Sequence, residues 1–317
     1  MEAVGAVNGL LTQSFLTALV AGGIVAAIPL MFTALGESVS ERSGVLNIGL
    51  EGMMLLGAYM GFLGAYELHS MWLGFLAGIA GGLVGSVVMV VLSVAMGLDQ
   101  IVVGIAITIA GEGVTSVLQQ AQFKGTFPGL GNPATVAIPG LSSIPVLGHS
   151  VFDQPLLVYL GVGLLAGVSW MFRSTAWGLN LRAAGEKPEA LDAAGVSVLA
   201  VRTYAVVTTG ALAGLGGAYL SIVGAGTFTP FMTQGQGFMA IVIAMLARGK
   251  PLWVGVSSLV FGMCLSIGTA LQLTSLNISA DVINMLPFVA IMAALVLFAR
   301  GSYLPPALCL PYVRGAK

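Results

Sequence analysis

Two acidic residues lie within long apolar stretches of this 317-residue chain, where acids are rare. A charge near the centre of a bilayer costs about 2.5 to 3.5 kcal/mol or more, so Glu51 and Glu112 are expected to face a protein interior or a polar path rather than lipid. Asn47 precedes Glu51 by four residues. On one helical face, this amide and carboxylate would bond the hydroxyl groups or ring edges of a small polar ligand. With nearby amides and an aromatic ring, the candidate pathway residues are Asn47, Glu51, Glu112, Phe231, Gln236 and Asn284.

Other roles for these residues stay open. Glu51 alternatively caps a broken helix or bonds backbone exposed by glycines, whereas Glu112 lies nearer the middle of its apolar run, which favours cavity lining. Phe231 can stack on a flat ring or belong to an interfacial aromatic belt. Glu51 and Glu112 together would also suit the relay of a proton-coupled secondary transporter, which needs no ATPase. An intramembrane hydrolase would need a nucleophile beside a base, and the two histidines, near the outer boundaries, do not provide one.

The elements that position these residues are membrane-spanning helices. Hydrophobic residues make up 57% of the chain and charged residues only 7%, far from the balance of soluble proteins. The apolar runs suit helices that cross a hydrocarbon core about 30 Å thick, and barrel strands would instead alternate over about ten residues. The sequence predicts an all-α, polytopic bundle in a single domain, 1–317, with about nine spans, eight to ten being possible. The spans are residues 12–35, 45–66, 71–96, 100–118, 151–172, 203–223, 235–247, 252–273 and 282–299, of which 235–247 is short enough to be re-entrant or broken.

Basic residues give the expected orientation. If the polar stretch 173–202 is cytoplasmic, ten of the eleven Lys and Arg residues lie on that side and only Lys124 lies outside, in keeping with the positive-inside rule. The N-terminus is then outside, and the tail, 301–317, is cytoplasmic. The basic residues predicted inside are Arg42, Arg173, Arg182, Lys187, Arg202, Arg248, Lys250, Arg300, Arg314 and Lys317.

The predicted extracellular loop, 119–150, is long and rich in turn signals. Pro128-Gly129, Asn132-Pro133 and Pro139-Gly140 recur at short intervals. Loops longer than about 15 residues in compact proteins are often functional. We expect this loop either to contact an external protein that delivers the ligand or to form a lid that seals the bundle from water.

The polar cytoplasmic stretch contains a short predicted helix. Pro188 suits a first helical position and Gly195 a C-terminal cap, with acids in the first turn. Ala190, Leu191 and Ala194 recur at helical spacing and make a small apolar face that suits insertion into a groove on a partner. The alternative is a solvated loop whose charges only obey the positive-inside rule.

Two stretches of this sequence resemble a known family. The stretch around Pro188 looks like the coupling loop of ABC importer permeases, in which a Gly-Glu-x-Pro-x-Ala pattern followed by a glycine carries a short helix into the ATPase subunit. Residues 36–55, GESVSERSGVLNIGLEGMML, are similar to the start of permeases of the ribose and branched-chain amino acid group, especially its simple-sugar and nucleoside branch. The resemblance covers about residues 35–300. It implies a cytoplasmic coupling loop at 173–202 in which contact with the ATPase involves Gly185, Glu186, Pro188, Glu189, Ala190, Leu191, Ala194 and Gly195.

The resemblance implies a permease subunit of an ATP-driven importer in the bacterial cytoplasmic membrane, which works by alternating access. Its expected partners are an ATPase, a second permease that is identical or homologous, an extracytoplasmic binding lipoprotein and membrane lipid, without nucleic acid. The chain itself is expected to be no enzyme, because its only Gly-Lys pair, Gly249-Lys250, lacks the rest of a Walker A loop. ATP and Mg then belong to the partner, and the two cysteines imply no disulfide or metal framework. Nucleosides are the expected substrates, with a simple sugar or a ribityl compound such as riboflavin next.

Overall fold

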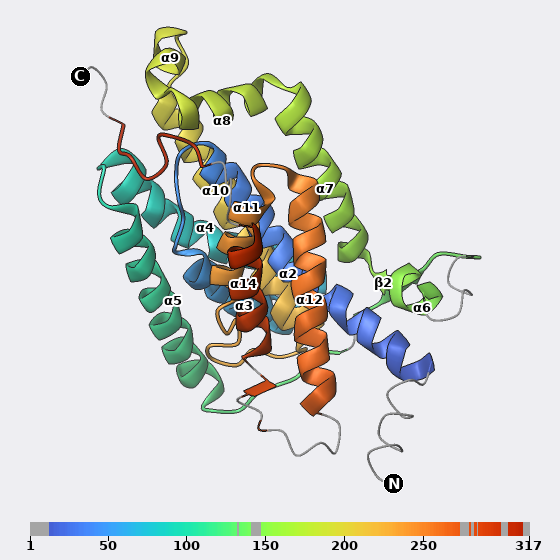
Figure 1. Ribbon diagram of the computed structural model, residues 1–317. Coiled ribbons are helices and arrows are strands. Elements are labelled where there is room, and N and C mark those ends of the chain that lie inside the picture. The colour runs from blue at the N-terminus through green and yellow to red at the C-terminus, as the bar shows by residue number, and fades with distance from the viewer. Residues whose placement is uncertain are drawn as a thin grey trace.

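The computed structural model describes residues 13–131, 133–140, 147–272, 279, 282–283, 285–298 and 304–312. They form a bundle of long helices with a two-stranded sheet at one edge (Figure 1). The helices of the bundle are α2 (Gln13–Arg42), α3 (Leu50–Glu67), α4 (Met71–Met89), α5 (Gln100–Phe123), α7 (Leu156–Ser174), α10 (Val198–Tyr219), α11 (Gln236–Ala247), α12 (Pro251–Gln272) and α14 (Leu286–Phe298). The smaller elements are the π-helical turns η1 (Val90–Ala95) and η2 (Leu220–Gly224), the helices α6 (Leu147–Phe152), α8 (Ala176–Glu186) and α9 (Pro188–Ala193), and the strands β1 (Thr135–Ala137) and β2 (Asp153–Pro155).

The predicted polytopic helical bundle is confirmed, because each of the predicted spans contains a helix. Within the described residues, six helices are long and apolar enough to cross a membrane, namely α2, α4 with η1, α5, α7, α10 with η2, and α12. The helices α11 and α14 are apolar but shorter. The short span predicted at 235–247 is α11, which has 12 residues.

The first two predicted spans have different bounds in the structure. The helix α2 continues past residue 35 to Arg42, and α3 begins at Leu50 instead of residue 45. Residues 43–49 between them are not helical. Asn47 therefore precedes α3, and the prediction that it shares a helical face with Glu51 is wrong.

Side chains bond the backbone of the non-helical segment 43–49, which is largely buried. The Glu37 carboxylate accepts a hydrogen bond from the Asn47 amide at 3.0 Å, and the Gln100 side-chain oxygen accepts one from the Leu46 amide at 2.8 Å. Backbone polar groups that are buried away from water need such hydrogen-bond partners. Glu37, one of the polar residues that follow residue 35, thus stabilises the buried connection between α2 and α3.

Glycines allow α3, α4 and α10 to pack backbone against backbone. Gly217 on α10 lies so close to α3 that an added Cβ would overlap the carbonyl oxygen of Met54. Gly82 on α4 meets the carbonyl oxygen of Gly210 on α10 in the same way. Such close approach is how helices associate where lipid removes the hydrophobic driving force.

Replacing Gly217 with alanine is expected to destabilise the bundle by about 1–3 kcal/mol, because the new methyl group meets backbone that has no rotamer to change. Thermal unfolding of the purified protein in detergent measures the effect. Gly113→Ala is the matched control, since an added Cβ at Gly113 on α5 meets nothing within 4 Å. Equal melting temperatures for the two variants would contradict this packing.

The stretch predicted as the extracellular loop begins later than residue 119. The helix α5 runs to Phe123, so Gln119 belongs to the helix, and its side-chain amide donates to the carbonyl of Thr126 at 3.2 Å. The predicted start of the loop at 119 is therefore wrong. Beyond it, β1 pairs antiparallel with β2, with Thr135 opposite Pro155, and β2 moves the start of the next long helix from the predicted 151 to Leu156.

The opposite end of the bundle carries α8, α9 and the described part of the tail, 304–312 (Figure 1). The stretch predicted as a loop at 173–202 is mostly helical, because α7 ends at Ser174 and α10 begins at Val198 with α8 and α9 between them. Lys124, the basic residue predicted to lie on the other side, ends α5 at the far end of the bundle.

Candidate functional site

Glu51 lies in the first turn of α3 and is almost completely buried. Its Oε1 atom accepts hydrogen bonds from Thr233 Oγ1 at 2.5 Å and from the Gly235 amide at 2.7 Å. Its Oε2 atom accepts one from the Gly237 amide at 2.6 Å. Both amides lie at the start of α11, where the first N–H groups have no partner within the helix. Glu51 therefore caps the short helix α11 from a neighbouring helix.

Asn47 is also occupied by its own chain. It is completely buried, and its Oδ1 atom accepts a hydrogen bond from the Gly49 amide at 3.1 Å. Its side-chain nitrogen lies 3.4 Å from the sulfur of Met53. Asn47 and Glu51 thus shape the backbone on either side of the start of α3, and the described contacts of both go to neighbouring protein groups.

A cavity of about 420 Å³ lies beside the N-terminal end of α11. Its polar lining includes Gln234, Gln236, Thr269 and Gln272, and Phe288 adds an aromatic ring. The side-chain oxygen of Gln236 is buried and accepts no hydrogen bond from the part of the chain that the structure describes. Because buried polar atoms are normally paired, this acceptor suits a ligand donor. The volume is within the range of about 300–1,000 Å³ that is typical of small-molecule sites.

The predicted coupling helix is present as α9, with the capping that the sequence predicts. Pro188 occupies the first turn, and Gly195 has a positive φ of 84° just after the helix. The Gly195 amide donates to the Asp192 carbonyl at 2.9 Å, and the Val196 amide donates to the Leu191 carbonyl at 3.2 Å. This pair of bonds is the Schellman motif, in which glycine adopts the left-handed conformation without a steric penalty.

The buried and exposed side chains of α9 differ from those that the sequence predicts. Leu191 is 5% exposed and packs in a core cluster with Phe172 and Leu181. The prediction of an apolar face that includes Leu191 and enters a partner is therefore wrong, because this side chain attaches α9 to its own bundle. Ala190 and Ala194 are exposed, as are Glu189 and Gly195.

The last turn of α8 lies against the C-terminal end of α2. Gly185 is buried, and an added Cβ would overlap the carbonyl oxygen of Arg42. Glu186 pairs instead with Arg182 one turn earlier, at 2.7 Å. The Gly-Glu pair of the motif thus combines a close backbone approach with a surface ion pair.

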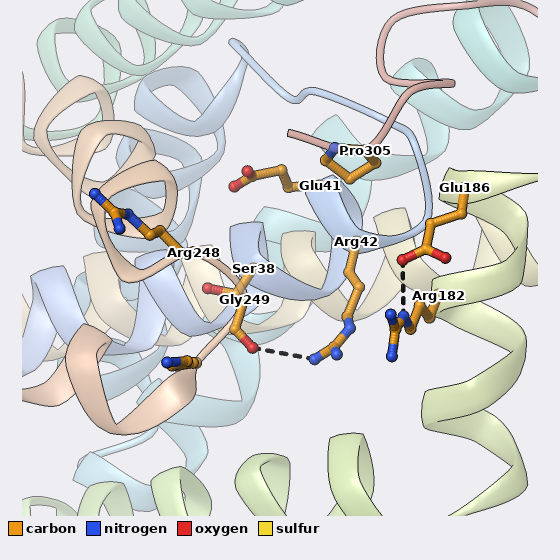
Figure 2. Close-up of a pocket in the computed structure, with 9 residues that line it drawn as sticks. Ser38, Glu41, Arg42, Arg182, Glu186, Arg248, Gly249 and Pro305 are labelled. Carbon is orange, nitrogen blue, oxygen red and sulfur yellow. Dashed lines mark hydrogen bonds and ion pairs between the residues drawn. The ribbon is translucent and has the colours of Figure 1, made fainter. Parts of the chain in front are cut away.

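A polar pocket of about 280 Å³ lies where α2, α8 and the turn between α11 and α12 meet (Figure 2). Arg42 points from α2 toward this turn and donates to the Gly249 carbonyl at 3.1 Å. Its guanidinium carbon also lies 4.2 Å from the ring centroid of Phe172 on α7. Arg248 and Lys250 join the same lining. Arg42 therefore ties the C-terminal end of α11 to the helices that carry α8 and α9.

A family model described as the permease component of branched-chain amino acid transport systems matches residues 19–297. The chain belongs to this family. The permease is 34% identical over 288 residues to a putative glucose ABC transporter permease protein of Haloferax volcanii, a match that covers 90% of this chain and 85% of the relative. It is 33% identical to a guanosine ABC transporter permease protein of Bacillus subtilis, a match that covers 95% of this chain and 98% of the relative. It is 30% identical to a nucleoside ABC transporter permease protein of Lactococcus lactis subsp. cremoris, covering 93% and 96%.

These similarities confirm the sequence-based assignment to the ABC permeases of the nucleoside and sugar branch. Together with the apolar helices, they identify the permease as a multi-pass protein of the cytoplasmic membrane.

The remaining candidate pathway residues that the structure describes do not line one cavity. Gln236 lines the cavity beside α11, but Phe231 is 54% exposed and does not belong to its lining. Glu112 is half-buried on α5 and also lies outside that lining. Asn284 lies outside the described residues.

Sequence reasoning missed Thr233, which donates to Glu51, and Phe288, which supplies the aromatic wall of the cavity. Both lie far from their partners along the chain, and neither belongs to a motif. A possible signal was the position of Thr233 and Gln234 just before the short predicted helix, where capping groups are expected.

Proposed function

We propose that this permease is the membrane subunit of an ATP-driven importer that moves nucleosides into the cell by alternating access. The observation that carries the proposal is the similarity to the guanosine and nucleoside permeases over nearly the full length of both partners. A simple sugar is the second substrate class, since another relative is described as a putative glucose permease. A ribityl compound such as riboflavin is the third.

The proposed assembly places ATP hydrolysis in a partner subunit. An ATPase that binds ATP and Mg contacts the exposed surface of α9, and a second permease and an extracytoplasmic binding lipoprotein complete the importer. The exposed Ala190 and Ala194 lie on a short helix whose base is fixed by buried Leu191 and Gly185, an arrangement suited to receiving force. The shared location of α9, the tail and the pocket-lining basic residues supports a cytoplasmic C-terminus and an external N-terminus.

We further propose that the cavity beside α11 is part of the substrate path. Its amides can bond the edges of a nucleobase or the hydroxyls of a ribose, and Phe288 can stack on a flat ring. The helix α11 connects this cavity to the Arg42 contact at its other end, because the Gly249 carbonyl follows directly after the helix. Movement of α8 and α9 then reaches the cavity through a single short helix.

Replacing Gln236 with leucine is expected to raise the KM for nucleoside uptake about three- to tenfold, as for one lost hydrogen bond to a neutral ligand. Uptake of radiolabelled guanosine by cells that contain the complete transporter measures it. Gln120→Leu on the exposed surface of α5 is the control for the same change of side chain. An unchanged KM for Gln236→Leu would exclude this acceptor from the path.

The substrate class is tested by deleting the gene from its native cell and following uptake of guanosine, glucose and riboflavin in parallel. Loss of guanosine uptake alone supports the proposal. Loss of glucose or riboflavin uptake with normal guanosine uptake would replace nucleosides as the substrate class, and normal uptake of all three would contradict the proposed range of substrates.

A further inference from the structure

The tail segment 304–312 forms backbone hydrogen bonds to the parts of the permease that carry α9. The Ala307 amide donates to the Gly185 carbonyl at 2.9 Å, in the last turn of α8. The Cys309 amide donates to the Gly44 carbonyl at 3.2 Å, in the turn that follows α2. The tail thus bridges the base of the coupling helix and the non-helical segment 43–49 between α2 and α3.

Arg202 on α10 connects this segment to the bundle. The residue is 3% exposed. Its Nε atom donates to the Ser43 carbonyl at 3.2 Å, and its Nη1 atom donates to the Leu310 carbonyl at 2.8 Å. A buried guanidinium is costly without hydrogen-bond acceptors. The bonds from Arg202 to these two carbonyls therefore hold Ser43 and Leu310 in place.

We infer that Arg202 is a positioning residue for the coupling helix and that it acts by holding the tail segment 304–312 against Gly185. This inference rests on the proposed coupling role of α9. The path is short, since Gly185 is three residues before Pro188, where α9 begins. Fixing the Gly185 carbonyl therefore fixes the direction in which α9 leaves α8.

One side of α9 is exposed, although its base is held in place by the tail. A groove of about 340 Å³ separates the start of α9 from the tail. Pro188 and Glu189 line it from α9, Leu310 and Tyr312 line it from the tail, and Arg202 also belongs to its lining. The tail thus supports α9 through Gly185 while the groove remains open between them.

The test uses the complete transporter in proteoliposomes and measures nucleoside transported per ATP hydrolysed. Arg202→Met and a truncation after residue 303 are each expected to lower this ratio about threefold or more, with assembly and ATP hydrolysis retained. Combining them should give no further fall, because coupled residues on one path are non-additive. Arg202→Lys should recover part of the ratio, and Leu304→Ala should leave it unchanged, because it changes an exposed side chain that does not line the groove.

Three results would overturn the inference. A normal ratio in the truncated permease would exclude a role for the tail, and this variant decides the matter alone if Arg202→Met fails to fold. Independent, additive losses from the two changes would show that Arg202 acts through Ser43 instead. Absence of ATP-driven uptake by the unmodified transporter would overturn the proposed function, and this role with it, before any variant is compared.

Discussion

Replacing Glu51 with alanine is expected to abolish uptake and to destabilise the permease by about 3 kcal/mol or more. The change leaves the Thr233 hydroxyl and the amides of Gly235 and Gly237 without their acceptor at the start of α11. Each buried donor left unpaired costs about 1–3 kcal/mol. Thermal unfolding in detergent and nucleoside uptake in cells measure the two effects.

Glu51→Gln separates a structural cap from a proton relay. Glutamine keeps the shape and one acceptor but turns an NH₂ group toward a backbone donor, so stability should fall by a smaller amount. Glu112 on α5 is half-buried, so the same change there, Glu112→Gln, should alter the melting temperature little. Full stability of Glu51→Gln together with lost, proton-dependent uptake would contradict the cap and favour a secondary transporter.

Replacing Ala194 with arginine is expected to weaken binding of the ATPase partner at least about tenfold, which corresponds to about 1.4 kcal/mol. Ala194 is exposed on the proposed docking surface, and a long charged side chain there would separate two packed surfaces. The melting temperature of the permease alone should not change. Binding of the purified ATPase to immobilised permease measures the loss, and uptake should fall with it.

Two controls show whether this loss is local. Ala137→Arg makes the same substitution on exposed β1, in the two-stranded sheet at the edge of the bundle and away from α9, and should leave ATPase binding unchanged. Leu191→Asp should instead lose the folded permease, because it places a charge in the cluster with Phe172 and Leu181. Normal ATPase binding by Ala194→Arg would exclude this surface of α9 from the interface.

Much of the bundle could be predicted from local sequence, because membrane spans and helix caps depend on neighbouring residues. Apolar runs located the helices, the shortness of α11 was visible, and Pro188 and Gly195 bracketed α9. The start of α3 could not be located in this way. Gly44, with a positive φ of 89°, ends α2 locally, but the bond from the Leu46 amide to the Gln100 side chain depends on a residue that lies 54 positions away.

The candidate site was harder to predict because its contacts join residues far apart in the chain. Glu51 stood out as an acid in an apolar run, but its role as a cap depends on Thr233 and the start of α11, 182 or more positions away. The inward direction of Leu191 likewise depends on Phe172 and Val198, which the helical periodicity of α9 does not reveal. The role of the tail becomes visible only through backbone bonds that no motif encodes.

We propose that a separate ATPase drives this permease. Affinity purification of the tagged protein from its native cell in mild detergent, followed by mass spectrometry and an ATPase assay with added nucleosides, tests it most directly. We expect an ATPase with paired Walker motifs, a second permease and a binding lipoprotein in the eluate, with ATP hydrolysis. A permease that purifies intact but alone, without ATP hydrolysis, and that takes up nucleoside only with a proton gradient would contradict the account.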